Sequence, residues 1–282
     1  MARVGITMIS LFERRALCDL AEALAREAGD LALAGRKAGL SEVRTKSTST
    51  DMVTEFDHVC ENVITNGLRN ARPHDAIVGE EGASDQGTSG LTWYIDPIDG
   101  TTNFYFDLPN WAVSIGVVDN EGPLAGAVYV PALGELFTGA RGLGAFVNGE
   151  KISVRDNSLL TDALVCTGFS YAPERRLRQA RRVANMVHKV RDVRRFGAAA
   201  IDLCFVACGR LDAYFEEFLH PWDLVAGGII ATEAGAIITN FSGGVMEPRE
   251  VLASTPGVHK ELVALITDAT IALGDSESDS LL

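Results

Sequence analysis

The sequence predicts an α+β fold in which layered sheets are covered by helices. Three observations lead to this prediction. Apolar residues recur at helical spacing over 17–31 and 56–68, strand-like segments follow one another over 111–138, and helices and strands then intermix up to residue 267. A simple doubly wound sheet would instead alternate strands and helices from its beginning. With 47% hydrophobic residues, the 282-residue chain has enough apolar material for a large core.

Two amphipathic helices open the expected order of elements. Ser10 and Glu13 have the spacing of a capping box, and the apolar residues after them predict a helix that reaches about Gly35. The small, polar residues of 41–50 predict a mobile loop. A second helix is expected from about Thr54, and it places Asp57 in its first turn.

The remaining elements are short strands and further helices. Strands expected over 76–78 and 91–95 end in G-E-E-G and at Asp96, and a meander is expected over 111–138. Later strands are expected over 163–167, 211–215, 236–239 and 251–254, and later helices over 173–188, 198–208, 222–234 and 259–267. We expect one domain over 1–266, with a soft subdivision near 154–162, and a disordered acidic tail over 267–282.

Composition and charge exclude several classes of function. A formal net charge of -13 argues against general binders of nucleic acids or anionic membranes, because these proteins neutralise phosphates with Lys and Arg. The five cysteines are scattered, and no His stands beside them at ligand spacing, which favours free thiols over a zinc site or a disulfide framework. We read no signal peptide, and Glu233 interrupts the apolar run 224–239, so we expect a cytoplasmic protein that does not enter a membrane.

Acidic residues gather where the expected elements begin or end. They are Asp57, Glu80, Glu81, Asp96, Asp99 and Asp223. Taken singly, most have a structural explanation, because an acid in the first turn of a helix complements the helix dipole and the two glutamates suit a solvated turn. Asp96 and Asp99 differ, since they would repel each other across a turn stiffened by Pro97 unless a cation lies between them. Hard oxygen ligands without His or Cys indicate Mg²⁺ or Mn²⁺, and the acids lack the spacing of an EF-hand calcium loop.

The residues that follow Asp99 predict a site for an anion. Gly100 lets the backbone approach a ligand closely. A helix that begins with Thr101 and Thr102 offers free N–H groups and a hydroxyl to an anion the size of phosphate. A cation beside a phosphate cradle indicates hydrolysis of a phosphate ester by activated water, in which two metal ions can clamp the attacking and leaving oxygens. We see no covalent nucleophile in this pattern.

Four motifs resemble the inositol monophosphatase family. They are K-S-T-S-T-D-M-V-T-E-F-D (46–57), G-E-E-G (79–82), D-P-I-D-G-T-T-N-F (96–104) and H-P-W-D-L-V-A-G-G (220–228), and the resemblance spans roughly residues 10–265. It implies an αβαβα layered fold and usually a homodimer. It also implies Mg²⁺-dependent, lithium-sensitive hydrolysis of phosphate monoesters, with inositol 1-phosphate as the expected substrate.

The resemblance also implies a role for each acid of the site. Glu80, Asp96 and the carbonyl of Ile98 would hold one metal ion. Asp96, Asp99 and Asp223 would hold a second ion, and Glu80 would help to hold a weaker third ion through water molecules.

The attacking water and the substrate are assigned in the same way. Thr101, hydrogen-bonded to Asp57, would position or activate the water, with Glu80 as a further catalytic residue. Lys46 would lie in the mobile loop that closes near the metal ions. The phosphate and the substrate hydroxyls would meet Asp99, Gly100, Thr101, Ala199, Glu216 and His220.

Several alternatives stay open. The same chemistry could act on histidinol phosphate, fructose 1,6-bisphosphate, NADP or 3′-phosphoadenosine 5′-phosphate, and Phe106 and Glu217 depart from the family pattern where they could alter the substrate pocket. Some relatives are regulatory proteins that bind RNA or the transcription machinery. A basic run over 175–195 raises that possibility here, although a solvated helix face, partly paired with a dimer mate, is the simpler interpretation. His220 is as consistent with a core histidine as with a substrate contact.

Overall fold

The computed structural model describes residues 9–39, 43–45 and 52–271. Lys46 and residues 272–282 lie outside these ranges, so the roles expected for the closing loop and for the acidic tail stay predictions.

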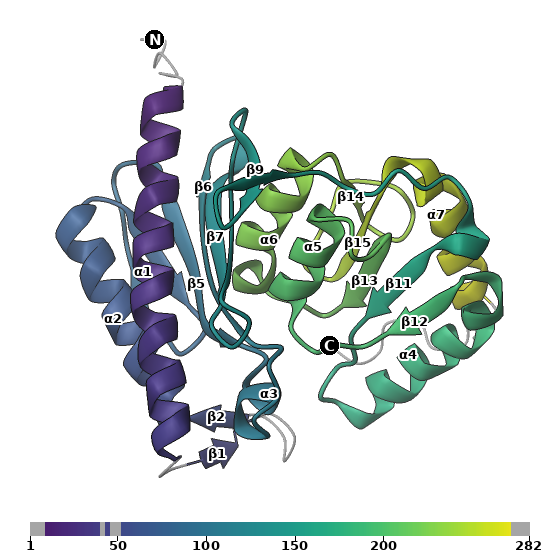
Figure 1. Cartoon of the computed structure of the whole chain (residues 1–282), viewed down its shortest axis with the longest axis horizontal. Coiled ribbons are helices and arrows are strands. Elements are labelled where there is room, and N and C mark those ends of the chain that lie inside the picture. The colour runs from purple at the N-terminus through teal and green to yellow at the C-terminus, as the bar shows by residue number, and fades with distance from the viewer. Residues whose placement is uncertain (1–8, 40–42, 46–51, 272–282) are drawn as a thin grey trace.

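Helices and strands follow one another along the chain in the order that Figure 1 labels. The first half contains α1 (Leu11–Ala38), β1 (Val43–Thr45), β2 (Met52–Thr54), α2 (Glu55–Ala71), β3 (Ala76–Gly79), β4 (Ser84–Asp85), β5 (Thr92–Asp99), α3 (Thr101–Tyr105), β6 (Ala112–Asp119), β7 (Gly122–Val130), β8 (Glu135–Ala140), β9 (Gly144–Val147) and β10 (Glu150–Ile152). The second half contains β11 (Leu164–Thr167), α4 (Pro173–Met186), β12 (Asp192–Arg194), α5 (Ala199–Ala207), β13 (Ala213–Glu217), α6 (Pro221–Glu233), β14 (Ile237–Thr239), β15 (Glu250–Ser254) and α7 (Pro256–Ile271), with short 3-10 turns at Leu160–Asp162 and Val187–Lys189.

Two large sheets and the helices around them stack in layers (Figure 1). The larger sheet has the strand order β10-β9-β8-β7-β6-β5-β3-β4, and the smaller sheet has the order β12-β11-β13-β15-β14. Helices α1 and α2 cover one face of the larger sheet, α5 and α6 fill the space between the sheets, and α4 and α7 cover the far face of the smaller sheet. This αβαβα arrangement confirms the expected fold. The chain passes from the larger sheet to the smaller one between β10 and β11, and the division into domains stays a prediction.

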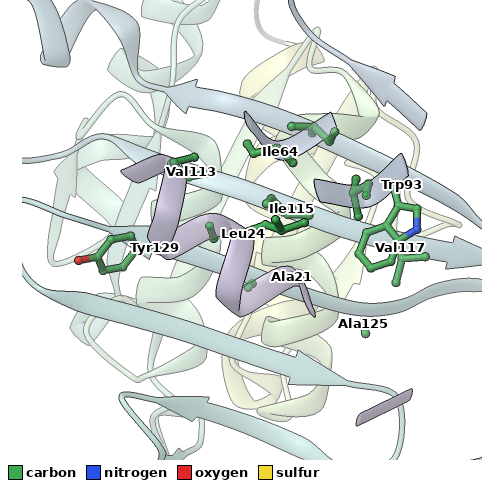
Figure 2. Close-up of a cluster of buried hydrophobic side chains, with 14 of the residues drawn as sticks. Ala21, Leu24, Ile64, Trp93, Val113, Ile115, Val117, Ala125 and Tyr129 are labelled. Carbon is green, nitrogen blue, oxygen red and sulfur yellow. The ribbon is translucent and has the colours of Figure 1, made fainter. Parts of the chain in front are cut away.

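A core between α1, α2 and the larger sheet fixes the position of α2. Ala21 and Leu24 lie on the buried face of α1 because apolar residues recur there at helical spacing. Figure 2 shows Leu24 near Ile115 of the sheet, and Ile64 of α2 and Trp93 of β5 belong to the same cluster. Complete burial of a large apolar side chain contributes about 1.5–3 kcal/mol. This packing sets α2 against β5, and a hydrogen bond from Thr101 to Asp57 joins the first turn of α2 to the residues that follow β5.

The D-P-I-D segment corrects one prediction, because it belongs to a strand and not to a turn. Strand β5 continues through Asp99, and its pairing with β6 shifts register between Asp96 and Asp99. A β-bulge of this kind leaves backbone groups outside the ladder, which suits a proline that has no N–H to donate. The bulge also changes the direction of the strand where the two carboxylates stand.

The structure differs from the sequence prediction at other elements too. The hairpin β9–β10 was not predicted, although its turn is Asn148-Gly149 with positive φ at both residues, a strong hairpin signal. Strands β1, β2, β4 and β12 were also missed, and β1 lies within the segment 41–50 that was expected to be a mobile loop. Helix α7 runs to Ile271 instead of ending at 267, because Ile266 and Ala269 are buried beside the smaller sheet. Residues 267–271, which were expected to begin the disordered tail, therefore belong to this helix.

Candidate active site

A cleft of about 300 Å³ lies where the ends of β3 and β5 approach α3, α5, β13 and α6. Its walls include Glu80, Asp96, Ile98, Asp99, Gly100, Thr101, Ala199, Glu216, His220 and Asp223. These are the residues that the sequence analysis assigns to metal, phosphate and substrate. Asp57 lies behind Thr101 and is fully buried.

Strand pairing brings the first two carboxylates together. Strands β3 and β5 run parallel, so their carboxyl ends meet at one edge of the sheet. Glu80 directly follows β3, and its backbone N–H donates to the carbonyl of Ile95 at 3.1 Å. Asp96 is the next residue on β5, and its Oδ1 accepts the N–H of Ile98 at 3.0 Å within the bulge.

Gly100 makes the turn from β5 into α3. Its backbone has φ +90° and ψ 40°, a left-handed conformation that glycine adopts without steric cost. A Cβ atom here would stand 3.0 Å from the carbonyl oxygen of Asn110 and 3.2 Å from that of Gly197. This requirement explains a glycine between Asp99 and Thr101. The opening of α3 then presents N–H groups that have no partner within the helix.

The carboxylates of the cleft raise one another's pKa. Burial raises the pKa of Asp96 well above its usual value, and the neighbouring charges of Glu80, Asp99 and Asp223 raise it further. Burial likewise raises the pKa of Asp99 to about 7, opposed by the Ala200 N–H, which donates to its Oδ2 at 2.7 Å. Within the described ranges, no lysine or arginine side chain forms an ion pair with these three aspartates.

Asp223 enters this cluster from the first turn of α6. Its Oδ2 accepts the backbone N–H of His220 at 2.7 Å, so the carboxylate caps the helix. Burial raises its pKa well above the usual value, and the charges of Asp99 and Glu80 add to the effect. The Asp223 carboxylate thus both caps α6 and belongs to the acidic cluster.

Asp57 and Thr101 form a buried hydrogen-bonded pair. The Thr101 hydroxyl lies 3.2 Å from Asp57 Oδ1 and 3.1 Å from the Ile98 carbonyl. The other oxygen of Asp57 accepts the N–H and the hydroxyl of Thr54 at 2.8 and 2.6 Å, which completes a capping box at the start of α2. Burial raises the pKa of Asp57 to about 7 despite these hydrogen bonds, and Glu81 and Glu80 raise it too.

Sequence reasoning missed Glu61, which supports the G-E-E-G loop. Its buried carboxylate accepts the backbone N–H of Glu81 at 2.8 Å and that of Ala83 at 2.9 Å. Glu61 stands one helical turn after Asp57, so both point from the same face of α2. One helix face therefore holds both Thr101 and the loop that carries Glu80. The i,i+4 spacing of the two acids was the available signal.

The opposite wall of the cleft carries Glu216 and Arg195. Burial raises the pKa of Glu216 to about 7, and the hydrogen bond from Tyr214 and the charge of Arg195 oppose this rise. Arg195 lines the cleft, yet the sequence showed it only as part of a basic run. Asn103 was missed as well, and its side-chain amide joins the segment before β6 to the segment before α5 by donating to the carbonyls of Asn110 and Phe196 at 2.6 and 2.7 Å.

The rim decides between the two interpretations of His220 and corrects the one given for the basic run. The His220 side chain is 62% exposed and stacks on Trp222 with ring centroids 4.7 Å apart, so it is not a core histidine. The basic run is not wholly a solvated face, because the Arg182 side chain is 1% exposed and forms a buried ion pair with Glu217. That pair turns the Glu217 carboxylate toward α4, although its residue borders the cleft.

The donor set suits a hard divalent cation. It consists of buried carboxylates that destabilise one another's charged forms, together with a backbone carbonyl, and Mg²⁺ prefers oxygen ligands of this kind. Among the residues that the structure describes, no three such side chains already stand in ligating geometry. The set therefore fits a metal by its chemistry and its mutual repulsion.

Comparison with known proteins identifies the family. The model of the inositol monophosphatase family matches residues 13–271. An inositol-1-monophosphatase of Mycobacterium bovis is 41% identical over 272 residues, covering 89% of this chain and 93% of that protein. A Nus factor SuhB of Pasteurella multocida is 36% identical, covering 88% and 94%.

Solved structures and the search for membrane spans complete the comparison. An inositol monophosphatase structure from Anabaena has a TM-score of 0.80 at 33% identity, and the match covers 90% of this chain and 96% of that one. Among the described residues, no helix combines the length and the apolar character needed to cross a membrane. The chain belongs to the inositol monophosphatase family and is a phosphomonoester hydrolase.

Proposed function

We propose that this chain is a Mg²⁺-dependent inositol-1-phosphatase in which water attacks the phosphorus directly. The observation that carries the proposal is the buried cluster of Asp96, Asp99 and Asp223, whose members raise one another's pKa in a cleft. Bound divalent cations would relieve this repulsion and attract an anionic substrate into an acidic protein. The relatives named inositol-1-monophosphatase support the choice of substrate.

Two or three Mg²⁺ ions, or Mn²⁺ ions in their place, would be held by the same groups. We assign one ion to Glu80, Asp96 and the Ile98 carbonyl, and a second to Asp96, Asp99 and Asp223, with Glu80 aiding a third through water. When bound, the ions would lower the pKa of water and stabilise the charge that develops on the phosphate.

Thr101 and Asp57 would orient the attacking water and take up its proton. The Thr101 hydroxyl has one proton, which it can donate either to Asp57 or to the Ile98 carbonyl. When that proton points to Asp57, the hydroxyl oxygen can accept a hydrogen bond from a water molecule in the cleft. A carboxyl group with a pKa of about 7 is well matched to proton transfer near neutral pH.

The remaining residues would hold the two ends of the substrate. The N–H groups of Gly100 and Thr101 would bind phosphate oxygens at the opening of α3. Glu216 and the Ala199 N–H would meet hydroxyls of the leaving group, and exposed His220 borders the same space. Asp99, which lines the cleft and accepts the Ala200 N–H, would contact the substrate between these two ends.

The test is phosphate release from a panel of monoesters. The panel contains inositol 1-phosphate, histidinol phosphate, fructose 1,6-bisphosphate, NADP and 3′-phosphoadenosine 5′-phosphate, each with Mg²⁺, with EDTA and with added Li⁺. We expect inositol 1-phosphate to be hydrolysed fastest, Li⁺ to inhibit and EDTA to abolish turnover. Full turnover in EDTA would refute the metal assignment. Preference for another ester would change the substrate and leave the chemistry in place.

A transcription-associated role is the second candidate. One relative is named Nus factor SuhB, and Arg175, Arg176 and Arg181 are exposed on α4 of this chain. The net charge of -13 opposes RNA binding. A gel-shift assay with RNA and co-purification with RNA polymerase at low salt decide the matter, and failure of both removes this candidate. On the family resemblance we also propose that the protein is a cytoplasmic homodimer. Light scattering can measure its oligomeric state.

A further inference from the structure

The carboxylate of Glu216 is held from the side by Tyr214. The two residues alternate with Phe215 on β13, so their side chains leave the same face of the strand. The Tyr214 hydroxyl donates to Glu216 Oε2 at 2.7 Å, and Tyr214 is fully buried. One oxygen of the carboxylate is therefore occupied by a group that belongs to the core between the sheets.

Gly168 lets the same carboxylate lie directly against the backbone. It follows β11, which pairs in parallel with β13 and places Thr167 opposite Phe215. A Cβ atom at Gly168 would stand 1.8 Å from Glu216 Oε2 and 2.1 Å from Oε1. Any side chain at position 168 would therefore displace the carboxylate from its present place.

Glu217 shows that this arrangement is specific to one of two adjacent acids. Successive side chains of a strand point to opposite faces. Glu217 accordingly points toward α4, where Arg182 binds both of its oxygens. Glu216 points into the cleft, where the charge of Arg195 favours its ionised form. Of these two acids, Glu216 is the one whose carboxylate points into the cleft.

We propose that Tyr214 and Gly168 are positioning residues that determine substrate specificity, because together they hold the Glu216 carboxylate where it accepts hydrogen bonds from hydroxyl groups of a polyol leaving group. This inference rests on the proposed function. It adds that selection of a polyol over a leaving group without hydroxyls depends on the Tyr214 hydroxyl, which itself does not touch the substrate. Hydrolysis as such does not depend on it, because Tyr214 does not line the cleft and, among the described residues, its hydroxyl donates to Glu216 and not to a group assigned to metal, water or phosphate.

The experiment compares Tyr214→Phe with wild type on two substrates. Inositol 1-phosphate offers hydroxyls to Glu216, whereas p-nitrophenyl phosphate has none on its leaving group. Loss of one hydrogen bond to a charged acceptor should lower kcat/KM for inositol 1-phosphate about tenfold to a hundredfold, mainly through KM. The value for p-nitrophenyl phosphate should stay unchanged. Gly168→Ala should lower kcat/KM for inositol 1-phosphate further, because its Cβ atom displaces the Glu216 carboxylate.

Tyr129→Phe is the matched control. Its hydroxyl also donates to a carboxylate, that of Asp30 on α1 at 2.9 Å, and neither residue lines the cleft. It should leave both kcat/KM values unchanged. Thermal unfolding of both variants measures any loss of stability. Such a loss should lower kcat/KM for both substrates alike and leave the ratio of the two values unchanged.

The outcomes separate this inference from the proposed function. If wild type prefers inositol 1-phosphate and Tyr214→Phe keeps that preference, only the positioning role is overturned. Equal losses on both substrates would likewise overturn it, because they indicate a general structural role. If wild type hydrolyses p-nitrophenyl phosphate without preferring the polyol ester, the substrate assignment and this inference fail together while the hydrolase chemistry remains. Turnover of neither substrate with Mg²⁺ would overturn the proposed function and the inference alike.

Discussion

Replacement of Glu61 should weaken Mg²⁺ binding, although Glu61 is not among the groups proposed to hold the metal. Its carboxylate accepts the N–H groups of Glu81 and Ala83 at 2.8 and 2.9 Å, on either side of the turn that follows Glu80. Glu61→Ala removes both acceptors. The loop then loses the support that fixes the position of the Glu80 side chain.

The size of the effect follows from these two bonds. Hydrogen bonds to a charged group contribute about 1.5–3 kcal/mol each, so the loop loses up to about 3–6 kcal/mol of local stabilisation. Part of this loss is recovered when water reaches the freed N–H groups. Loss of a residue that orients a metal ligand typically weakens metal affinity by about 10- to 100-fold, and we expect a rise of that order in the Mg²⁺ Kd. Glu61→Gln, which keeps one acceptor oxygen, should lie between Glu61→Ala and wild type.

Isothermal titration calorimetry with Mg²⁺ measures this effect without turnover. Asn62→Ala is the control, because Asn62 is the next residue on the same helix and is exposed, whereas Glu61 is buried. It should bind Mg²⁺ as wild type does. If Glu61→Ala lowers Tm but keeps the wild-type Kd for Mg²⁺, then Glu61 stabilises the fold and does not position the site, and the reasoning is refuted.

Two further predictions concern a hydroxyl and a buried acid. Thr101→Val should lower kcat by about 10²–10⁴-fold with little change in KM, because the backbone N–H groups that bind phosphate remain. Thr101→Ser should keep most of the activity. Steady-state kinetics measure both variants, and an equal loss in the two would contradict the role of the hydroxyl. Asp202 is fully buried, and burial raises its pKa well above the usual value. The folded protein therefore keeps a proton that the unfolded chain releases as pH rises, so wild type loses stability from about pH 4 upward and Asp202→Asn avoids this loss. Its Tm should exceed that of wild type by about 2 °C or more near pH 8 and match it near pH 4, and a difference independent of pH would contradict the assignment.

Local patterns in the sequence predicted the layered fold and the main helices. Periodicity identified α1 and α2 because each buries one continuous face. Strands as short as β4 and β12 have too few residues for a pattern, and their pairing partners define them. The strand through Asp96 and Asp99 was predicted as a turn because proline usually ends a strand, whereas here a bulge accommodates it.

The candidate site followed from the sequence where its residues form a contiguous motif. Asp96, Asp99 and Gly100 are neighbours in the chain, and the structure places them in one cleft. Glu61 was missed because it supports a loop 20 residues away that only the tertiary structure brings to it. Tyr214 was missed although it stands two residues from Glu216 on one strand, because the sequence does not show that its hydroxyl turns toward that carboxylate. Arg182 looked like part of a basic surface, and only the packing of α4 shows that it is buried.

The central claim is that a cluster of carboxylates with bound Mg²⁺ carries the hydrolysis. Phosphate release from inositol 1-phosphate by Asp96→Asn at saturating Mg²⁺ tests it most directly, because Asn keeps the shape of the side chain and removes the charge proposed to bridge two ions. We predict that turnover falls by several orders of magnitude. Turnover near that of wild type would contradict the account.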